Sequence, residues 1–342
     1  MPKSVTRWLL HKFKDIDKER LSKHLDVLSK ESGRSKPYIL ADMAVNFLRH
    51  GTGYTDYFRA DFLHLTEEEK ETWCTAKKFY NVIHYLNDPA YIHTLHNKIE
   101  FNEVFRDYIR RDFIDLNTAT AEDFAAFLQG KTAVFAKDPT GECGHGITKY
   151  AVADITDPAA LYAALKESGQ LLVEDAIVQC KEMNEINPHV VNSFRVVTLY
   201  KDGRAQVIAN GLRVNQDDTQ VIGCTNDVYF SLGADGHITS NVIDDYGTVY
   251  ETHPLTGKKF SDVCIPGVGE AFRMCEEAAE KLPQVRYIGW DVAFSVNGPV
   301  MVEGNEYPGY GFLQFHKLTG SRTGHLKTIA DVLGDEMNNI KL

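Results

Sequence analysis

The stretch from Tyr287 to Phe315 constrains the fold most strongly, because it combines two strand-like segments with polar side chains at fixed positions. Side chains on a strand alternate between its two faces, so Glu303 and Asn305 project from the same face of the second segment. Asp291 lies on the first segment. If the two segments pair as a hairpin, these three oxygen-bearing side chains can converge on one face of a sheet.

Whether the three side chains converge depends on the turn between the segments. A two-residue turn at the Asn-Gly pair would leave Asp291 and Glu303 on opposite faces. An odd-numbered loop brings them to one face, and the simplest such loop is Val296 to Gly298. Gly298 would supply the left-handed conformation that glycine adopts most readily. We therefore expect a three-residue turn.

The type of side chain indicates which ion such a site would bind. Hard oxygen ligands without Cys or His favour Mg²⁺, which commonly binds through one or two carboxylates plus the phosphates of a substrate. Asp291, Glu303 and Asn305 therefore form a candidate metal site. The alternative, an ordinary hairpin with exposed polar residues, stays open on this stretch alone.

Length, composition and charge restrict the class of protein. The chain of 342 residues is long enough for about two domains. Its hydrophobic content of 43% and charged content of 25% are those of a soluble globular protein. No apolar run is long enough to span a bilayer and no signal-peptide core is present, so we expect a cytoplasmic protein without a membrane partner.

Charge and cysteine content exclude further classes. The net charge of −11 opposes a general nucleic-acid surface, so we expect no nucleic-acid partner. Six cysteines without a C-x-x-C motif indicate neither a disulfide framework nor a zinc site. The oligomeric state cannot be inferred from the sequence.

The first part of the chain, residues 1–96, is expected to be helical. Apolar residues recur at helical spacing from Trp8 to Leu28, and Gly33 is a helix stop. At least two more helices follow before residue 96. This region predicts a helical cap in front of the remaining chain.

A glycine-rich loop lies between two predicted strands, Thr132 to Lys137 and Ile147 to Val152. A P-loop or a dinucleotide fingerprint requires a helix directly after the glycines, so neither fits. A glycine hairpin can still place backbone N–H groups against phosphate oxygens, with Lys137 as a point charge. A flexible surface turn is the alternative.

Two arginines lie on predicted strands further along the chain. Arg195 lies in the strand from Val190 to Leu199, and Arg213 lies in the strand from Ala205 to Val214. A guanidinium on the face of a central sheet is costly to bury without an anion, so a phosphate or carboxylate partner is expected for each. A solvated arginine that faces outward is the alternative.

The order of these motifs resembles the ATP-grasp superfamily. A strand, glycine hairpin and strand with Lys137 are followed by the linker VEDAI (173–177), the strand NSFRVVT (192–198), the motif GWDV (289–292) and the motif EGN (303–305). The last two motifs, with Pro308-Gly309, are most similar to the sugar-transfer-associated branch. The resemblance implies an α+β ATP-grasp fold, in which two α+β subdomains (97–175 and 176–342) grip ATP between antiparallel sheets behind a helical N-terminal region.

The resemblance also implies roles for individual residues. Lys98 and Lys137 would hold the ATP phosphates, the linker would take adenine and a residue near Glu182 would take ribose. Asp291, Glu303 and Asn305 would bind two Mg²⁺ ions, which Mn²⁺ could replace, and Arg195, Arg213 and Lys137 would act on the transferred phosphoryl group. The implied nucleotide-binding residues are Lys98, Lys137, Gly141, Gly144, His145, Gly146, Glu174, Asp175, Ile177 and Glu182.

The function implied is that of an ATP- and Mg²⁺-dependent ligase that activates a carboxylate as an acyl phosphate and joins it to an amine, in polysaccharide or small-metabolite biosynthesis. An ATP-grasp kinase and a non-catalytic ATP-binding module are the alternatives. Two departures from the family pattern leave the substrates undefined. An α/β substrate domain is not evident before the nucleotide-binding part, and residues 223–227 lack the expected Asp-Asn and Gly-Gly pattern.

Overall fold

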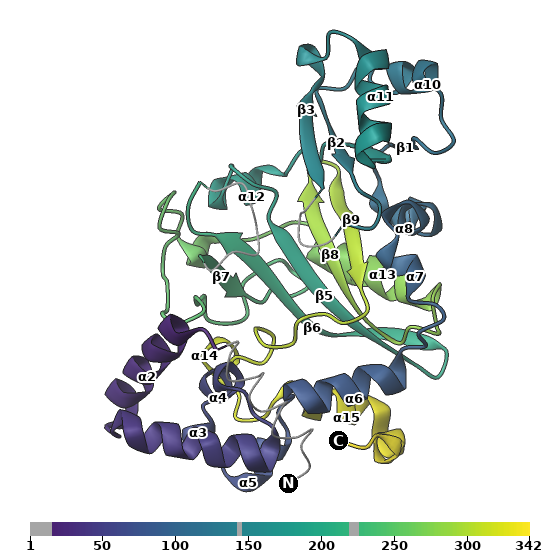
Figure 1. Ribbon diagram of the computed structural model, residues 1–342. Helices are drawn as coiled ribbons and strands as arrows, with labels where there is room; N and C mark the ends of the chain where they lie inside the picture. Colours follow the sequence, from purple (N-terminus) through teal and green to yellow (C-terminus); the bar gives the residue numbers. More distant parts are fainter. Residues whose placement is uncertain (1–15, 142–145, 219–225) are drawn as a thin grey trace.

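The computed structural model describes residues 16–141, 146–218 and 226–342. Two antiparallel sheets and their covering helices form the body of the protein, and further helices lie at its N-terminal end (Figure 1). The smaller sheet has the strand order β1-β4-β2-β3, and the larger sheet has the order β7-β6-β5-β8-β9. The expected mixed α+β fold with two antiparallel sheets is confirmed.

The small sheet carries the glycine hairpin. Its elements are β1 (Phe113–Asp115), α10 (Ala121–Phe127), β2 (Ala133–Lys137), β3 (Ile147–Ala151), η2 (Val152–Asp154), α11 (Pro158–Ser168) and β4 (Leu172–Asp175). Helices α10 and α11 cover one face of this sheet, and Phe124, Val134 and Leu165 form part of the core between them (Figure 1). Val134 and Ala136 of β2 face this core, so strand alternation places Lys137 on the opposite face of the sheet.

The large sheet contains the two strands that sequence analysis singled out. Its strands are β5 (Ser193–Lys201), β6 (Arg204–Asn215), β7 (Asp227–Phe230), β8 (Tyr287–Ser295) and β9 (Gly298–Asn305). Helix α13 (Val268–Glu280) covers one face, where Phe194, Leu212 and Trp290 belong to the largest core cluster. Residues that alternate with these, such as Arg195 and Asp291, therefore project from the opposite face.

The described part of the N-terminal region consists of helices joined by short connections, as expected. Residues 4–15 of the predicted first helix lie outside the described ranges. The helices are α2 (Lys18–Ser32), α3 (Lys36–His50), α4 (Tyr54–Ala60), η1 (Phe62–His64), α5 (Glu67–Glu71), α6 (Ala76–Leu86) and α7 (His93–His96). Helices α8 (Lys98–Val104) and α9 (Arg106–Ile109) then lead into the small sheet, while α12 (Lys181–Ile186) and η3 (Phe260–Asp262) belong to later connections.

The N-terminal helices pack against the end of the chain. After β9, residues 306–315 run to α14 (His316–Thr319), α15 (His325–Leu333) and η4 (Gly334–Asn339). Figure 1 shows α14 beside α4, and α15 beside α6. The segment 306–315 approaches the large sheet at two glycines, since a Cβ on Gly289 would lie 2.4 Å from Pro308 and one on Gly211 would lie 2.4 Å from Phe312. Glycine at these positions allows the segment to lie on the sheet.

The hairpin of β8 and β9 differs from the expected one. Ser295 pairs with Gly298, so the turn has two residues, and the expected three-residue loop is wrong. Gly298 does have a positive φ, of 102°. A register shift beside Asp291 leaves Val302 without a partner and pairs Asp291 with Glu303. The two carboxylates therefore share a face because β9 has one extra residue, which forms a β-bulge within the strand. Such a bulge changes which face the following residues occupy.

Candidate nucleotide and metal site

Three charged residues form a row across three neighbouring strands of the large sheet. Arg195 on β5 pairs in register with Asp291 on β8, and Asp291 pairs with Glu303 on β9. The Arg195 guanidinium donates from Nε and Nη2 to the two Asp291 oxygens, with 3.0 Å between Nη2 and Oδ2. The structure therefore brings together one predicted catalytic residue and two predicted metal ligands.

The two carboxylates of this row repel each other. Burial raises the pKa of Glu303, and the neighbouring Asp291 raises it further, whereas Arg195 and Lys98 oppose this. Asn305 lies two residues beyond Glu303, and its amide nitrogen is buried without a hydrogen-bond partner in the described part of the chain. A divalent cation would relieve the repulsion between Asp291 and Glu303, so this group of side chains fits Mg²⁺.

The protein supplies only part of a metal coordination shell here. Among the described residues, no group of three or more His, Cys, Asp or Glu side chains is arranged to hold a metal ion. Two carboxylates and one amide are what Mg²⁺ uses when phosphates and water complete its octahedron. The side chains thus suit a metal that arrives with a phosphorylated substrate better than one held by protein alone.

Two predicted phosphate-binding lysines lie close to this row. Burial lowers the pKa of Lys98, Glu303 opposes this, and the nearby positive charge of Lys137 lowers it further. The Lys98 ammonium donates to the carbonyl oxygen of Gly141, at the start of the glycine loop. Lys98, Lys137 and Glu303 are therefore gathered at one place, although they come from a helix, the small sheet and the large sheet.

Glu174 has a structural role that sequence analysis did not find. Its side chain is buried, with the residue 2% exposed. It accepts hydrogen bonds of 2.7 Å from Asn102 and from Arg111, and it forms an ion pair with Lys137. Burial alone would raise the pKa of Glu174, but the positive charges of Lys137 and Arg111 lower it to about 2. Both carboxylate oxygens are thus engaged by the protein, and the adenine contact expected of Glu174 stays a prediction.

Arg111 also connects the two sheets. Its Nη2 donates to Glu174 on β4, and its Nη1 donates to the carbonyl oxygen of Met301 on β9 at 2.6 Å. The sequence carries no local signal for this contact, since its partners lie 63 and 190 residues away in the chain. Arg111 therefore links the small sheet, which carries Lys137, to the hairpin of β8 and β9.

The remaining residues predicted to bind the nucleotide make fewer contacts with the protein than Glu174 does. Gly146 has φ of 73°, and its carbonyl oxygen accepts from the Asp138 N–H at 3.0 Å, which closes the base of the glycine hairpin. Asp175 lies 3.3 Å from Lys131, while Ile177 and Glu182 are half-buried. Gly144 and His145 lie outside the described residues. The nucleotide contacts of these residues stay predictions.

Arg213 has the anionic partner expected of a sheet arginine, and this partner belongs to the protein. Its Nη2 donates to Asp227 at 2.9 Å, and its guanidinium lies 5.3 Å from the centre of the Tyr229 ring. The same is true of Arg195, whose partner is Asp291. Any phosphate or substrate carboxylate at either arginine would share the guanidinium with an aspartate.

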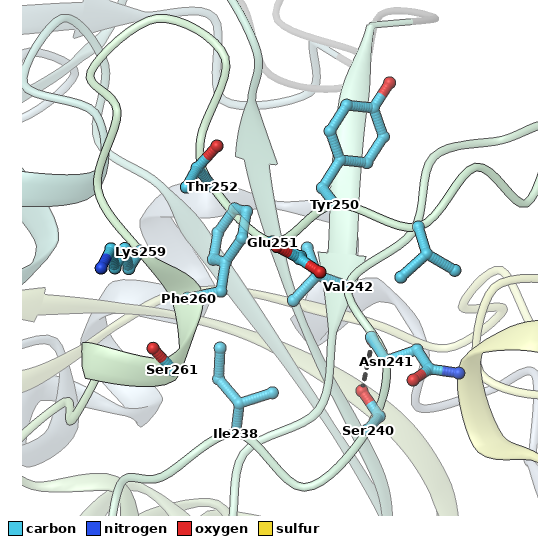
Figure 2. Close-up of a pocket in the computed structure, with 11 residues that line it drawn as sticks. Ile238, Ser240, Asn241, Val242, Tyr250, Glu251, Thr252, Lys259, Phe260 and Ser261 are labelled. Carbon is cyan, nitrogen blue, oxygen red and sulfur yellow. Dashed lines mark hydrogen bonds between the residues drawn. The ribbon is translucent and has the colours of Figure 1, made fainter.

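A surface pocket of about 560 Å³ lies elsewhere, lined by side chains from residues 238–252 and 259–261 (Figure 2). Ile238, Tyr250, Lys259 and Phe260 are among its lining residues. None of the predicted site residues lines it. Ser240 and Ser261 there donate to the adjacent residues Asn241 and Asp262.

The described arrangement has two antiparallel sheets, with Lys137 on one sheet and the paired Asp291 and Glu303 on the other. This arrangement is typical of the ATP-grasp class of proteins. The chain belongs to the sugar-transfer associated ATP-grasp family, whose model matches residues 123–329. This confirms the resemblance inferred from the motifs. None of the curated protein sequences matches the chain significantly.

Solved structures with a similar fold include ATP-grasp ligase PsnB in complex with a minimal precursor, at 17% identity and a TM-score of 0.43. The match covers 72% of this chain and 62% of PsnB. D-alanyl-alanine synthetase A from Vibrio cholerae matches at 15% identity and a TM-score of 0.42, over 74% of this chain and 67% of its own. An L-amino acid ligase from Bacillus licheniformis matches at 11% identity and a TM-score of 0.42, over 71% and 48%.

Within the described residues, no helix has the length and apolar character needed to cross a membrane.

Proposed function

We propose that this protein is an ATP- and Mg²⁺-dependent ligase that joins a carboxylate to an amine. The observation that carries the proposal is the gathering of Lys98, Lys137 and Arg195 around the carboxylates of Asp291 and Glu303. These cations suit the phosphates of ATP, and the carboxylates suit the cation that accompanies ATP. Family membership supports the same chemistry.

The reaction would proceed in two steps. A carboxylate oxygen of the first substrate attacks the γ-phosphorus, the bond between the β,γ-bridging oxygen and that phosphorus breaks, and ADP leaves. The amine nitrogen of the second substrate then attacks the acyl carbon of the acyl phosphate, inorganic phosphate leaves and the nitrogen loses a proton. Neither step requires a covalent bond to the protein, so the contribution of the chain is positioning and electrostatics.

The chain's own residues have distinct parts in this scheme. Lys98 and Lys137 would orient the β- and γ-phosphates, and Arg195 would neutralise charge that develops on the transferred phosphoryl group. Asp291, Glu303 and Asn305 would hold Mg²⁺, which when bound neutralises the phosphate oxygens of ATP. The glycine hairpin between β2 and β3 would cover the nucleotide and limit the access of water to the acyl phosphate.

The metal site is tested by Asp291→Asn and Glu303→Gln, which remove one negative charge each at constant size. We expect both variants to remain folded by circular dichroism and to lose turnover at least a hundredfold, since two carboxylates are the only charged metal ligands in the proposal. Phosphate release from Mg-ATP in the presence of mixed carboxylates and amines is the measurement. Wild-type turnover in both variants would refute the metal site.

Product analysis distinguishes the ligase from the kinase alternative. A ligase requires two acceptor substrates and releases inorganic phosphate, whereas a kinase leaves the phosphoryl group on its single acceptor. Mass spectrometry of the products separates the two outcomes. ATP binding without any turnover would favour the non-catalytic module.

A further inference from the structure

Two neighbouring arginines bind the outer edge of β9, which is the last strand of the large sheet. Arg110 Nη1 donates to the carbonyl oxygen of Pro299 at 3.2 Å, and Arg111 Nη1 donates to that of Met301 at 2.6 Å. These two carbonyl groups belong to alternate residues of the strand, so they point to the same edge. The arginines therefore supply donors where a further strand would otherwise pair.

Arg111 contacts the backbone of β9 at the bulge. The Met301 carbonyl belongs to the peptide bond with Val302, the extra residue that the register with β8 skips. A bulge disrupts the ladder locally, so a backbone group beside it needs another hydrogen-bond partner. The Arg111 guanidinium supplies that partner, and it thereby stabilises the backbone that places Glu303 beside Asp291.

The second terminal nitrogen of the same guanidinium binds the small sheet. Arg111 Nη2 donates to Glu174 Oε1 at 2.7 Å, while Glu174 Oε2 pairs with the Lys137 ammonium. The side chains of Arg111 and Glu174 are 6% and 3% exposed, so water and salt screen these contacts weakly. A short series of contacts thus runs from Lys137 through Glu174 and Arg111 to the bulge that precedes Glu303.

The shape of the guanidinium makes this double contact possible. Its two terminal nitrogens are fixed in one plane, so one side chain can hold two acceptors at a set separation. A lysine ammonium, in contrast, is a point charge on a flexible stem. A lysine at this position could neutralise Glu174, but it would not reproduce the fixed separation of the two acceptors.

Arg110 makes its contacts within the large sheet and the helix that covers it. Its Nη1 also donates to Glu270 on α13 at 2.5 Å, and its side chain is 35% exposed. The two arginines thus carry the same charge and donate to the same strand edge, and they differ in that Arg111 also reaches the small sheet. Arg110 is therefore a matched control for Arg111.

We propose that Arg111 is a positioning residue that sets the place of Lys137 relative to Glu303. The inference rests on the proposed ligase function, in which Lys137 meets a phosphate of ATP and Glu303 holds the Mg²⁺ that the same phosphates bind. One ligand must therefore span both sheets at once, and a fixed distance between its two anchors lowers the ordering cost of binding. Arg111 acts indirectly, through Glu174 and the backbone of β9.

The gain in ATP affinity that Mg²⁺ provides measures this alignment. ATP in the presence of EDTA can engage the lysines, whereas Mg-ATP requires the lysines and the carboxylates together. Faulty alignment therefore reduces the ratio of the two affinities, while general damage to the fold weakens both forms of the nucleotide alike. The affinity ratio is thus a readout that a purely structural role of Arg111 would not move.

Calorimetric titration of the full chain with ATP, once with Mg²⁺ and once with EDTA, tests the proposal. Arg111→Gln is expected to reduce the affinity ratio by about tenfold, as the loss of a hydrogen bond to a charged group typically does. Arg110→Gln is expected to leave the ratio unchanged. An unchanged ratio in Arg111→Gln, or an equal reduction in both variants, would overturn the positioning role.

The variant Arg111→Lys separates the shape of the guanidinium from its charge. It keeps a counter-charge for Glu174, so we expect it to unfold at a higher urea concentration than Arg111→Gln. Its affinity ratio should nevertheless remain as low as that of Arg111→Gln, and full recovery of the ratio would overturn the geometric role. Circular dichroism verifies folding, and if Arg111→Gln does not fold, the lysine variant carries the test.

The wild-type titrations keep the two proposals apart. Absence of Mg-ATP binding, or equal affinity with and without Mg²⁺, would contradict the ligase function and this inference together. A wild-type gain from Mg²⁺ that persists in both Arg111 variants would remove only the positioning role and leave the ligase proposal standing.

Discussion

At Glu174, a carboxylate that is almost inaccessible to water meets two cations, Lys137 and Arg111. Ion pairs of this kind contribute little net stability compared with apolar residues, but removal of one partner leaves the other charge buried. Glu174 therefore matters for the position of Lys137 in the proposed nucleotide site and for the contact of Arg111 with β9. Asp291 is likewise a buried carboxylate, and it forms an ion pair with Arg195.

Replacement of Glu174 by glutamine is expected to destabilise the protein by about 3 kcal/mol, because it leaves Lys137 and Arg111 without a counter-charge. Urea unfolding at pH 7 measures this. Glu122→Gln on α10, an exposed glutamate, serves as the control and is expected to change stability by less than about 0.5 kcal/mol. Equal effects of the two substitutions would contradict the assignment.

The pH dependence of this effect has a defined sign. The pKa of Glu174 is about 2 in the folded protein, below its ordinary value of 4.5, so its stabilising contribution is complete above about pH 4.5. The contribution is lost as the pH falls from 4.5 toward 2. The difference in stability between wild type and Glu174→Gln should therefore shrink across this range, provided that both remain folded.

At the scale of single elements, the bulge in β9 and the segment 306–315 shape the site. The sequence predicted a hairpin with Asp291 and Glu303 on one face, and this proved correct. The turn itself was predicted wrongly, because an odd residue can be accommodated in the loop or within the strand, and periodicity does not distinguish the two. Val302 has no feature in the sequence that marks it as the extra residue.

A substitution at Gly289 tests whether the segment 306–315 must lie close to the sheet. A Cβ at this position would lie 2.4 Å from Pro308 and 3.1 Å from the Arg195 Cδ, so Gly289→Ala must displace one or both. We expect a loss of about 1–3 kcal/mol in stability and a lower turnover, because Arg195 moves. Gly309→Ala meets no atom within 4 Å and is the matched control. Thermal unfolding and phosphate release measure both effects, and identical behaviour of the two variants would argue against a close approach.

At the scale of the whole molecule, the N-terminal helices and the large sheet enclose a group of charges. His24 on α2 is 1% exposed and stacks on Phe58 of α4 with 4.0 Å between ring centroids. Burial lowers its pKa to about 4, and Arg59 and Arg20 lower it as well, while Asp245 opposes them. Contact between the N-terminal helices and the rest of the protein thus includes a histidine that is held neutral.

This histidine makes docking of the helices sensitive to acid. Its folded pKa of about 4 lies below the ordinary value of 6.5, so the unfolded chain binds the proton more tightly and stability falls as the pH falls from 6.5 toward 4. The loss between pH 7 and pH 5 should be about 2 kcal/mol by the one-site linkage relation. Urea unfolding at both pH values measures the loss.

The variant His24→Phe keeps an aromatic ring on Phe58 and removes the titrating group. Its stability should therefore change less than that of wild type between pH 7 and pH 5. An unchanged pH dependence in this variant would show that other groups govern acid sensitivity.

The sequence by itself determined the family, the α+β fold class and the hairpin with Asp291 and Glu303 on one face, and it predicted the lysines and carboxylates of the proposed nucleotide site. These follow from local periodicity and from motifs in fixed order, which depend on residues close together in the chain. Only the tertiary structure decided that Arg111 spans the two sheets, that Val302 sets the register and that Arg59 meets Asp245, 186 residues away. Such contacts depend on how distant segments fold onto one another, and a single sequence carries no periodic signal for them.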